Sequence, residues 1–274
     1  MPPSSAPSRA GLQVRHHHPT PPQPSKQNQR APKAPKVPKK ELKVLMLHGY
    51  TQSGPLFRAK TRALEKLLAK SLAPLDASLT LHYPTAPMRL RPSDIPGFVP
   101  ASDVQHTAPE DDELDSWAWF RRDAATPTLF GFDEGMRAVA RAIADAGGVH
   151  GAGPDARKPP AAAEGWAAAL REANAGRPLQ FAVVYSGFFM PVDEVQWLYE
   201  PAIRTPTLHY IGGLDTVVEE ARSRGLVERC VDPLEALHPG GHYVPITREW
   251  MMPITGFIRK FAEQLEEKDS PKLS

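Results

Sequence analysis

Short apolar runs alternate with longer amphipathic segments along most of the chain. The runs of strand length lie at 42–47, 79–83, 181–185, 207–211 and 234–237. In 56–68 and 136–144, apolar residues recur at spacings of three and four, the stripe of a helix packed on a sheet. Strand, helix and strand in succession predict βαβ units, and therefore a mostly parallel sheet with helices on its faces.

Three more helices are expected, at 166–173, at 219–227 and from the last turn to about Leu265. The long segment 84–116 is dense in proline and acidic residues, and a loop of this length predicts a lid over the strand ends. Two tryptophans and a phenylalanine at 117–120 follow it. They are expected to anchor this loop to the core, with a substrate-lining wall as the alternative.

The first forty residues differ in composition from the rest of the chain. They hold eight Lys or Arg and no acidic residue, which leaves 25 basic and 31 acidic residues from Glu41 onward. This Pro-, Ser- and Gln-rich stretch cannot bury enough apolar surface to offset its ordering entropy. We therefore expect disorder at 1–40, one folded domain at 41–265, and disorder again at 266–274.

The composition also bears on partners and compartment. The basic tail lacks interleaved aromatic residues, so we expect no specific nucleic-acid partner. No apolar stretch approaches the roughly 18 residues of a membrane span, so no membrane association is expected. The single cysteine, Cys230, excludes an internal disulfide and fits a reducing compartment. A cytoplasmic protein is expected; mitochondrial import or a nuclear location through the basic tail stays open, as does the oligomeric state.

Two candidate catalytic residues follow neighbouring predicted strands. Asp215 comes after the 207–211 run and a glycine pair, and His242 comes after the 234–237 run and a second glycine pair. A carboxylate that holds one imidazole nitrogen fixes the tautomer and stabilises the imidazolium formed when the other nitrogen takes a nucleophile's proton. Alternatively, Asp215 caps a helix and His242 a turn. Their occurrence together favours the catalytic pair.

With these residues, the chain resembles the family serine hydrolases (FSH proteins), an α/β-hydrolase family that acts on esters and thioesters. The matching segments run in order through Lys43–Gly54, Trp117–Asp123, Gly131–Gly135, Phe181–Phe188, Gly212–Val217 and His238–Pro245. The resemblance implies an α/β-hydrolase three-layer sandwich, a small ester or thioester substrate and no cofactor. It also implies that Asp215 is the acid and His242 the base. The loop containing His48, Gly49, Tyr50 and Ser53 would supply an oxyanion-hole amide, from Tyr50.

The chain departs from the family between Gly151 and Lys158. FSH proteins have a strand ending in Gly-Phe-Ser-Gln-Gly and then a helix there, whereas this chain has only 152–157 and contains no Gly-x-Ser-x-Gly anywhere. The comparison implies that the nucleophile, the second oxyanion amide and the central strand are missing. Loss of the nucleophile alone reduces turnover by about a millionfold, so an inactive chain is expected. The sequence would then be a mis-spliced or mis-predicted version of an intact hydrolase, or a degenerate hydrolase. The alternative is a pseudoenzyme that binds an acyl group without catalysis or acts as a scaffold.

Two residues are candidate substitutes for the serine. Asp133 lies in a Gly-x-Asp-x-Gly segment, with a first-turn helix acid as the alternative. Ser186 lies at a strand end facing the predicted site, but Tyr-Ser-Gly is not expected to form a strained elbow. No metal is expected either: His48, His82, His209 and His242 show no ligand spacing such as His-Glu-x-x-His.

Overall fold

The computed structural model describes residues 40–95, 115–122, 128–149 and 157–269, all within the compact unit that begins at Lys39. The expected tail at 1–39, the segment 150–156 and residues 270–274 lie outside the described residues, as does most of the predicted lid. The helices are α1 (Gly54–Leu72), α2 (Phe132–Asp145), α3 (Glu164–Ala173), α4 (Asp193–Gln196), α5 (Glu220–Val227) and α6 (Arg248–Asp269), with short 3-10 turns at Ala73–Leu75 and Pro92–Asp94.

The predicted strands form and are parallel. One sheet pairs β1 (Lys40–Leu45) with β2 (Ala77–His82). In the other, β8 (Thr207–Gly212) lies between β7 (Ala182–Tyr185) and β9 (Leu234–His238). The α/β class inferred from the apolar pattern is therefore confirmed.

Two small antiparallel ladders were not predicted. β3 (Met88–Arg89) pairs with β4 (Trp117–Ala118), and β5 (Arg121–Arg122) pairs with β6 (Leu129–Phe130). Each strand has only two residues, too few to show an alternating pattern in the sequence. The β3–β4 ladder joins the start of the predicted lid to the aromatic segment that follows it.

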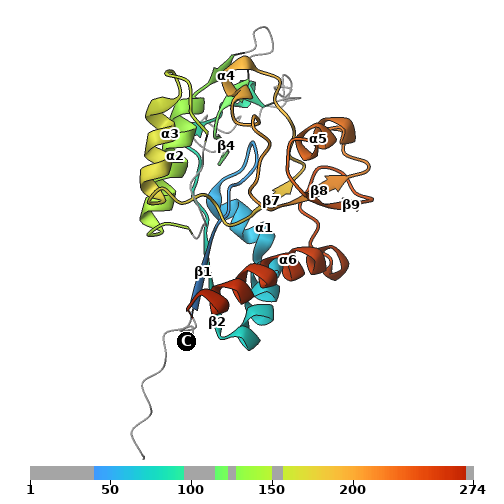
Figure 1. The fold of residues 1–274 in the computed structure, drawn as a ribbon. Coiled ribbons are helices and arrows are strands. Elements are labelled where there is room, and N and C mark those ends of the chain that lie inside the picture. The colour runs from blue at the N-terminus through green and yellow to red at the C-terminus, as the bar shows by residue number, and fades with distance from the viewer. Residues whose placement is uncertain (1–39, 96–114, 123–127, 150–156, 270–274) are drawn as a thin grey trace, which may run out of the picture. The chain divides into compact units, whose positions relative to one another are not determined.

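Side-chain alternation along β1 produces three layers. Leu42 and Val44 pack in a cluster with α1 and α6, whereas Leu45 packs on the opposite face with Val139 and Ile143 of α2. Figure 1 shows α2 and α3 together on one side of β1 and the α1–α6 pair on the other. Because successive strand residues point to opposite faces, a strand with apolar residues at both parities is covered by helices on both sides.

The two parallel sheets share a core but no backbone ladder. The cluster that contains Leu42 of β1 also contains Leu208 and Tyr210 of β8. A cavity of about 660 Å³ lies between the sheets, lined by β1 and by β7. In the described residues between α2 and α3 there is no strand, and these two helices pack directly on each other.

The last helix extends beyond the predicted end. α6 runs to Asp269, so 266–269, which we expected to be disordered, is helical. Glu266, Glu267 and Lys268 favour helix intrinsically, and a helix already anchored by its apolar stripe continues through them at little cost. The domain also begins one residue earlier than predicted, because Lys40 pairs with Ala77.

A tyrosine of β8 connects the sheet to α6. The Tyr210 hydroxyl donates to the Trp250 carbonyl at 2.7 Å and accepts from the Ile254 amide at 3.1 Å. These two groups would otherwise bond to each other in an α-helix, so the hydroxyl is inserted into the helical ladder beside Pro253.

Replacement of Tyr210 by Phe should therefore destabilise the fold, because it leaves a carbonyl and an amide of α6 without their hydroxyl partner. We expect the free energy of unfolding, measured by urea titration, to fall by about 1–3 kcal/mol. The control is Tyr243→Phe, at an exposed tyrosine, which should change it by less than about 0.5 kcal/mol. Equal effects of the two substitutions would contradict the assignment.

Candidate active site

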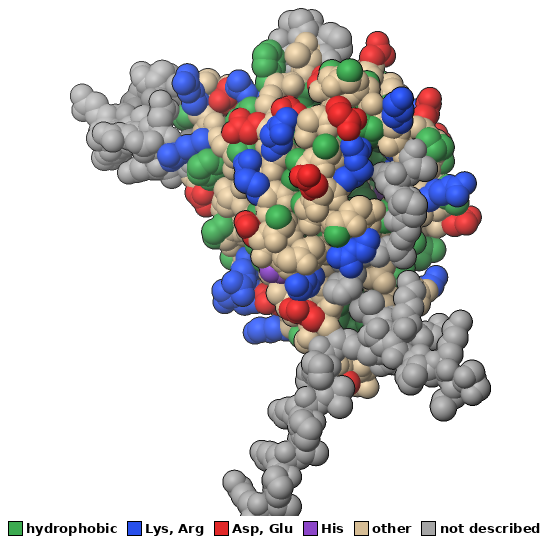
Figure 2. Space-filling view, turned by 60° about the vertical axis from the view of Figure 1, so that its left-hand side comes forward, with side chains coloured by type: hydrophobic (Ala, Val, Ile, Leu, Met, Phe, Trp, Pro, Cys, Tyr) green, Lys and Arg blue, Asp and Glu red, His purple; other side chains and the backbone are tan. Residues whose placement is uncertain are grey.

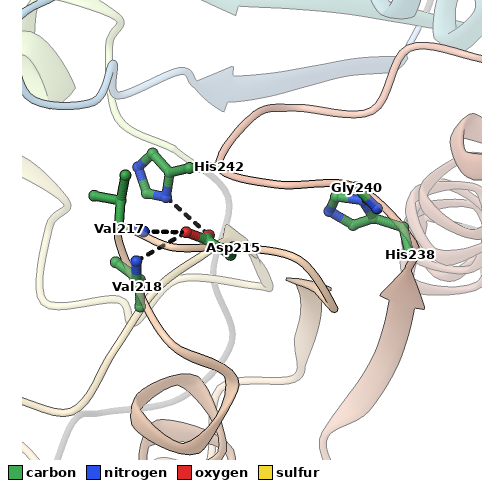
Figure 3. Close-up of polar contacts among 6 residues, drawn as sticks. All are labelled: Asp215, Val217, Val218, His238, Gly240 and His242. Atoms are coloured by element: carbon green, nitrogen blue, oxygen red, sulfur yellow. Dashed lines mark hydrogen bonds and ion pairs between the residues drawn. The ribbon is translucent and has the colours of Figure 1, made fainter.

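Asp215 and His242 meet at the carboxyl edge of the three-stranded sheet. Asp215 follows β8 and His242 follows the neighbouring strand β9, and parallel strands end at the same edge. The Nδ1 atom of His242 lies 2.9 Å from Oδ2 of Asp215 (Figure 3). The structure thus brings together the two residues that the sequence placed on separate loops.

The Asp215 carboxylate is buried and held at both oxygens. Oδ1 accepts hydrogen bonds from the amides of Val217 at 2.9 Å and Val218 at 2.8 Å (Figure 3). The Ser186 side chain lies beside this carboxylate and favours its charged form. Burial raises the pKa of Asp215, but these hydrogen bonds and the one from His242 outweigh it and lower the pKa to about 2. The group is therefore an anion at neutral pH.

His242 is oriented but remains accessible. Its side chain is 44% exposed, in contrast to the buried carboxylate. Because Nδ1 faces an anion, it donates to Asp215, and Nε2 has no hydrogen-bond partner among the described residues.

The turn that carries His242 depends on close backbone packing. A side chain at Gly212 would meet the carbonyl oxygens of Gly240 and Gly241 at 2.7 Å, so the end of β8 needs glycine there. The buried His238 accepts a hydrogen bond from the Gly240 amide at 3.2 Å (Figure 3). Burial lowers the pKa of His238, which keeps its ring neutral.

His48 is a structural residue of its loop. It is buried; Nδ1 lies 2.8 Å from the Gly49 carbonyl and Nε2 accepts from the Ala86 amide at 2.9 Å. Its own carbonyl accepts from Trp119, which stacks beside the ring. Burial lowers the pKa of His48. With both ring nitrogens bonded, the side chain fixes the loop and has no free base to offer.

The remaining residues of this loop divide between solvent and the helix start. Tyr50 is exposed, and its hydroxyl donates to the Asp94 carbonyl at 2.9 Å. Ser53 is buried and caps α1 by accepting from the Leu56 amide, while its hydroxyl donates to Asp115. A Ser N-cap satisfies one of the free amides of the first turn.

Ser186 adopts a strained backbone that the sequence did not predict. Its φ is 48°, in the left-handed region that non-glycine residues rarely adopt. The next residue is also tightly packed, since a side chain at Gly187 would lie 2.1 Å from Val184. The Ser186 side chain is buried at this turn and lies close enough to Asp215 to lower the pKa of its carboxyl.

Asp133 lies in the first turn of α2, where it forms an ion pair with Arg137 at 3.1 Å. This is the helix-acid alternative named from the sequence, and the side chain is largely exposed. No hydrogen bond in the described residues joins Asp133 to His242.

Other features of the described surface are less specific. Basic and acidic side chains intermingle on the face drawn in Figure 2, so that face carries no patch of a single charge. No described group of three His, Cys, Asp or Glu residues could hold a metal ion. No helix in the described ranges has the length and apolar character needed to span a membrane.

Comparison with known proteins identifies the family. The family described as serine hydrolase (FSH1) matches residues 37–254. This chain belongs to the FSH1 serine hydrolase family. It is 32% identical over 251 residues to "Family of serine hydrolases 2" of Saccharomyces cerevisiae, covering 82% of this chain and 97% of that protein. It is 30% identical over 234 residues to "Esterase OVCA2" of Danio rerio, covering 80% and 97%.

The FSH1 match spans the paired strands β1 and β2, the β7–β9 sheet and both residues of the Asp215–His242 pair. Among solved structures, the fold resembles Zea mays acyl-protein thioesterase 2, with 20% identity, a TM-score of 0.45, and coverage of 84% of this chain and 96% of that one.

Several residues that build the site were not foreseen. The amides of Val217 and Val218 hold Asp215, and Trp119 holds the His48 loop. Backbone donors carry no sequence signal of their own. The aromatic residues at 117–120 were expected to anchor the 84–116 segment; the Trp119 indole instead holds the His48 loop, so that expectation stays a prediction.

The buried Asp215 anion should make stability depend on pH. Its pKa is lowered from 3.8 to about 2, so its stabilisation is fully present above about pH 4 and is lost as pH falls toward 2. At pH 7 we expect Asp215→Asn to lower the free energy of unfolding by about 1–3 kcal/mol. The difference from the unsubstituted chain should shrink below pH 4 in urea titrations.

The matched control is Asp133→Asn, at the exposed ion pair with Arg137. It should change the free energy of unfolding by less than about 1 kcal/mol. A deficit of Asp215→Asn that stays constant between pH 7 and pH 2 would show that the carboxylate's charge is not what stabilises this turn.

Proposed function

We propose that this chain carries the acid and base of an FSH1-type hydrolase of esters or thioesters with small or medium acyl groups. The observation that supports this proposal is the 2.9 Å contact between His242 and the buried Asp215 anion at the carboxyl edge of the sheet. In this role Nε2 of His242 takes the nucleophile's proton, and Asp215 stabilises the resulting imidazolium through Nδ1. His242 then returns the proton to the leaving alcohol or thiol.

The backbone of the His48 loop supports a role in oxyanion binding. Within the described residues, the Tyr50 amide has no hydrogen-bond acceptor, although its neighbour Thr51 donates to Trp117 at 3.1 Å. An unpaired amide on a loop clamped by a buried histidine is a preorganised donor for a developing oxyanion. We assign this role to the Tyr50 amide. Gly49 precedes it without a side chain, and His48 and Ser53 hold the loop in place.

The surroundings of the pair favour an apolar acyl group. Leu214 and Val217 flank Asp215 and are 72% and 62% exposed, and Tyr243, beside His242, is 58% exposed. Large apolar side chains exposed side by side usually mark a binding surface. The acyl part of the substrate would cover them.

We infer that the chain with this sequence lacks the nucleophile and does not turn over substrate. No Gly-x-Ser-x-Gly occurs in its 274 residues. Ser186 lies beside the acid and forms no hydrogen bond to His242 within the described residues, and Asp133 is bonded to Arg137. An intact form of the gene, with a strand and serine elbow between α2 and α3, would be the active esterase.

The alternative function is non-catalytic binding of an acyl ligand, or a scaffold role. The exposed apolar residues around an intact acid–base pair favour ligand binding, because they need no nucleophile to act. Thermal stabilisation by a short-chain acyl ester that is not hydrolysed would support this function, whereas hydrolysis of the ester would exclude it.

A fluorophosphonate probe tests the missing nucleophile. Such a probe labels only a serine activated by a base, so the purified chain should show no labelling above that of His242→Ala. Labelling that is lost in both His242→Ala and Ser186→Ala would identify Ser186 as the substitute nucleophile and overturn the inference of inactivity. Transcript sequencing provides the independent check: an uninterrupted message across Gly151–Lys158, with no in-frame exon nearby, would exclude an intact form.

A further inference from the structure

A strand-shaped gap separates the two parallel sheets. The cavity of about 660 Å³ is bounded by five consecutive residues of β1 and its end, 43–47, and by the stretch 178–183 that leads into and forms β7. Apolar residues of four helices close it from both faces, among them Leu68 of α1, Ile143 of α2 and Ile258 of α6. The cavity thus has strands at two opposite edges and helices above and below.

Both bounding strands direct backbone groups into this gap. The amide of Met46 donates to the carbonyl of His82 in β2. The amides of Ala182 and Ser186 donate to the carbonyls of Pro206 and Tyr210, on the side of β8. In a parallel ladder, alternate residues direct their backbone groups to the same neighbour. Lys43 and Leu45 of β1 therefore face the gap, as do Val183 and Tyr185 of β7, and in the described residues no other strand pairs with them there.

The need of these backbone groups for hydrogen-bond partners distinguishes among possible occupants of the gap. Buried backbone groups need hydrogen-bond partners, and a hydrocarbon chain supplies none. A polypeptide strand supplies donors and acceptors along both of its edges while presenting side chains to the helical layers above and below. The apolar lining on both faces fits β-branched residues at every position, as in a central parallel strand.

The charged side chains that line the gap give the occupant a direction. All four, Lys43, Arg157, Arg171 and Arg177, are basic, although Arg171 pairs with Glu164 at 2.6 Å and Lys43 lies 4.0 Å from Glu41. Lys43 bonds to the Ala146 carbonyl, and Arg177 lies against Gly148, so the two charges flank the end of α2. Arg177 also precedes β7, which places positive charge at the amino end of that strand. An occupant parallel to β7 would meet these charges with its own amino-terminal end.

We propose that the gap between β1 and β7 binds a β-strand supplied by another polypeptide, apolar and β-branched, parallel to both strands, with acidic residues at its amino end. Strand addition of this kind derives its affinity from main-chain hydrogen bonds and its specificity from side-chain pockets. Here the added strand joins the two sheets through both of its edges. The proposal goes beyond hydrolysis and is tested without any substrate, so either proposal can fail while the other stands.

Amide hydrogen exchange, followed by NMR on the full chain, tests the proposal. The probe is a synthetic peptide of two Glu followed by about six Val, Ile and Thr residues, the usual length of a strand. At saturation, exchange at the amides of Lys43, Leu45, Val183 and Tyr185 should slow about tenfold or more, because these amides gain a partner. Exchange at Val44 and Val184, already bonded within their own sheets, should change less than about threefold.

Three results would overturn the proposed strand binding. These are no slowing of exchange at the four amides, equal slowing of exchange at all strand amides, and the same slowing of exchange with dodecanoate in place of the peptide. A peptide N-methylated at its two central residues should bind at least about tenfold more weakly, since each methyl removes a donor. Equal affinity of the methylated and unmethylated peptides would also contradict strand pairing.

A proline at Val183 provides the matched variant. Its amide faces the gap and not β8, so Val183→Pro removes a donor to the peptide and no ladder bond of the existing sheet. We expect peptide affinity to fall about tenfold, whereas Val183→Ala should keep it within about threefold. Unchanged affinity in folded Val183→Pro would contradict the proposal; if this variant does not fold, the methylated peptide decides.

Discussion

The parallel ladder between β8 and β9 is the constraint on which the site depends. Its register aligns Gly212 with His238, so β8 and β9 end side by side and the turns that follow them meet. Asp215 and His242 are far apart in sequence but become hydrogen-bonded neighbours by this alignment. The close approach of Gly212 to the Gly240–Gly241 turn allows the two loops to pack without a side chain between them. A shift of one residue in the ladder would separate the pair.

The environment of each histidine sets its chemical role. His48 and His238 are buried, their pKa values are lowered by burial, and each fixes a loop by accepting from a backbone amide. His242 has one nitrogen fixed by an anion and a side chain that is partly open to solvent. The same residue type thus builds the frame in two places and offers a free base in the third.

The division of the sheet lies close to the candidate acid–base pair in the fold. A single apolar cluster spans β1 and the β7–β9 sheet, so side-chain packing holds the two halves in one core. The backbone ladder is not continuous, and the cavity lies where a strand would complete it. In a parallel sheet the residue that follows a central strand lies at the same carboxyl edge as those that follow its neighbours. A strand placed in the gap would therefore end at the same edge of the sheet as the Asp215–His242 pair.

The apolar pattern predicted the main strands and helices and the order of the candidate residues, but not the two-residue ladders or α4. Apolar runs at 42–47 and 207–211 predicted β1 and β8 to within about two residues, because a buried strand needs a continuous apolar segment whatever surrounds it. The glycine pairs before Asp215 and His242 marked the turns. The end of α6 was misjudged, because polar helix formers do not show where a helix already anchored by packing stops.

The use of each candidate residue depends on contacts that form only when the elements pack together. The sequence does not distinguish the roles of Ser186 and Ser53, yet Ser186 lies beside Asp215 in a left-handed turn and Ser53 caps α1. The hydroxyl of Tyr210 has no sequence signal for its place inside the α6 ladder. These assignments depend on contacts between segments distant in the chain, and on backbone amides that every residue possesses. A local pattern fixes which element forms, whereas the partner of each buried polar group is fixed only when the elements pack together.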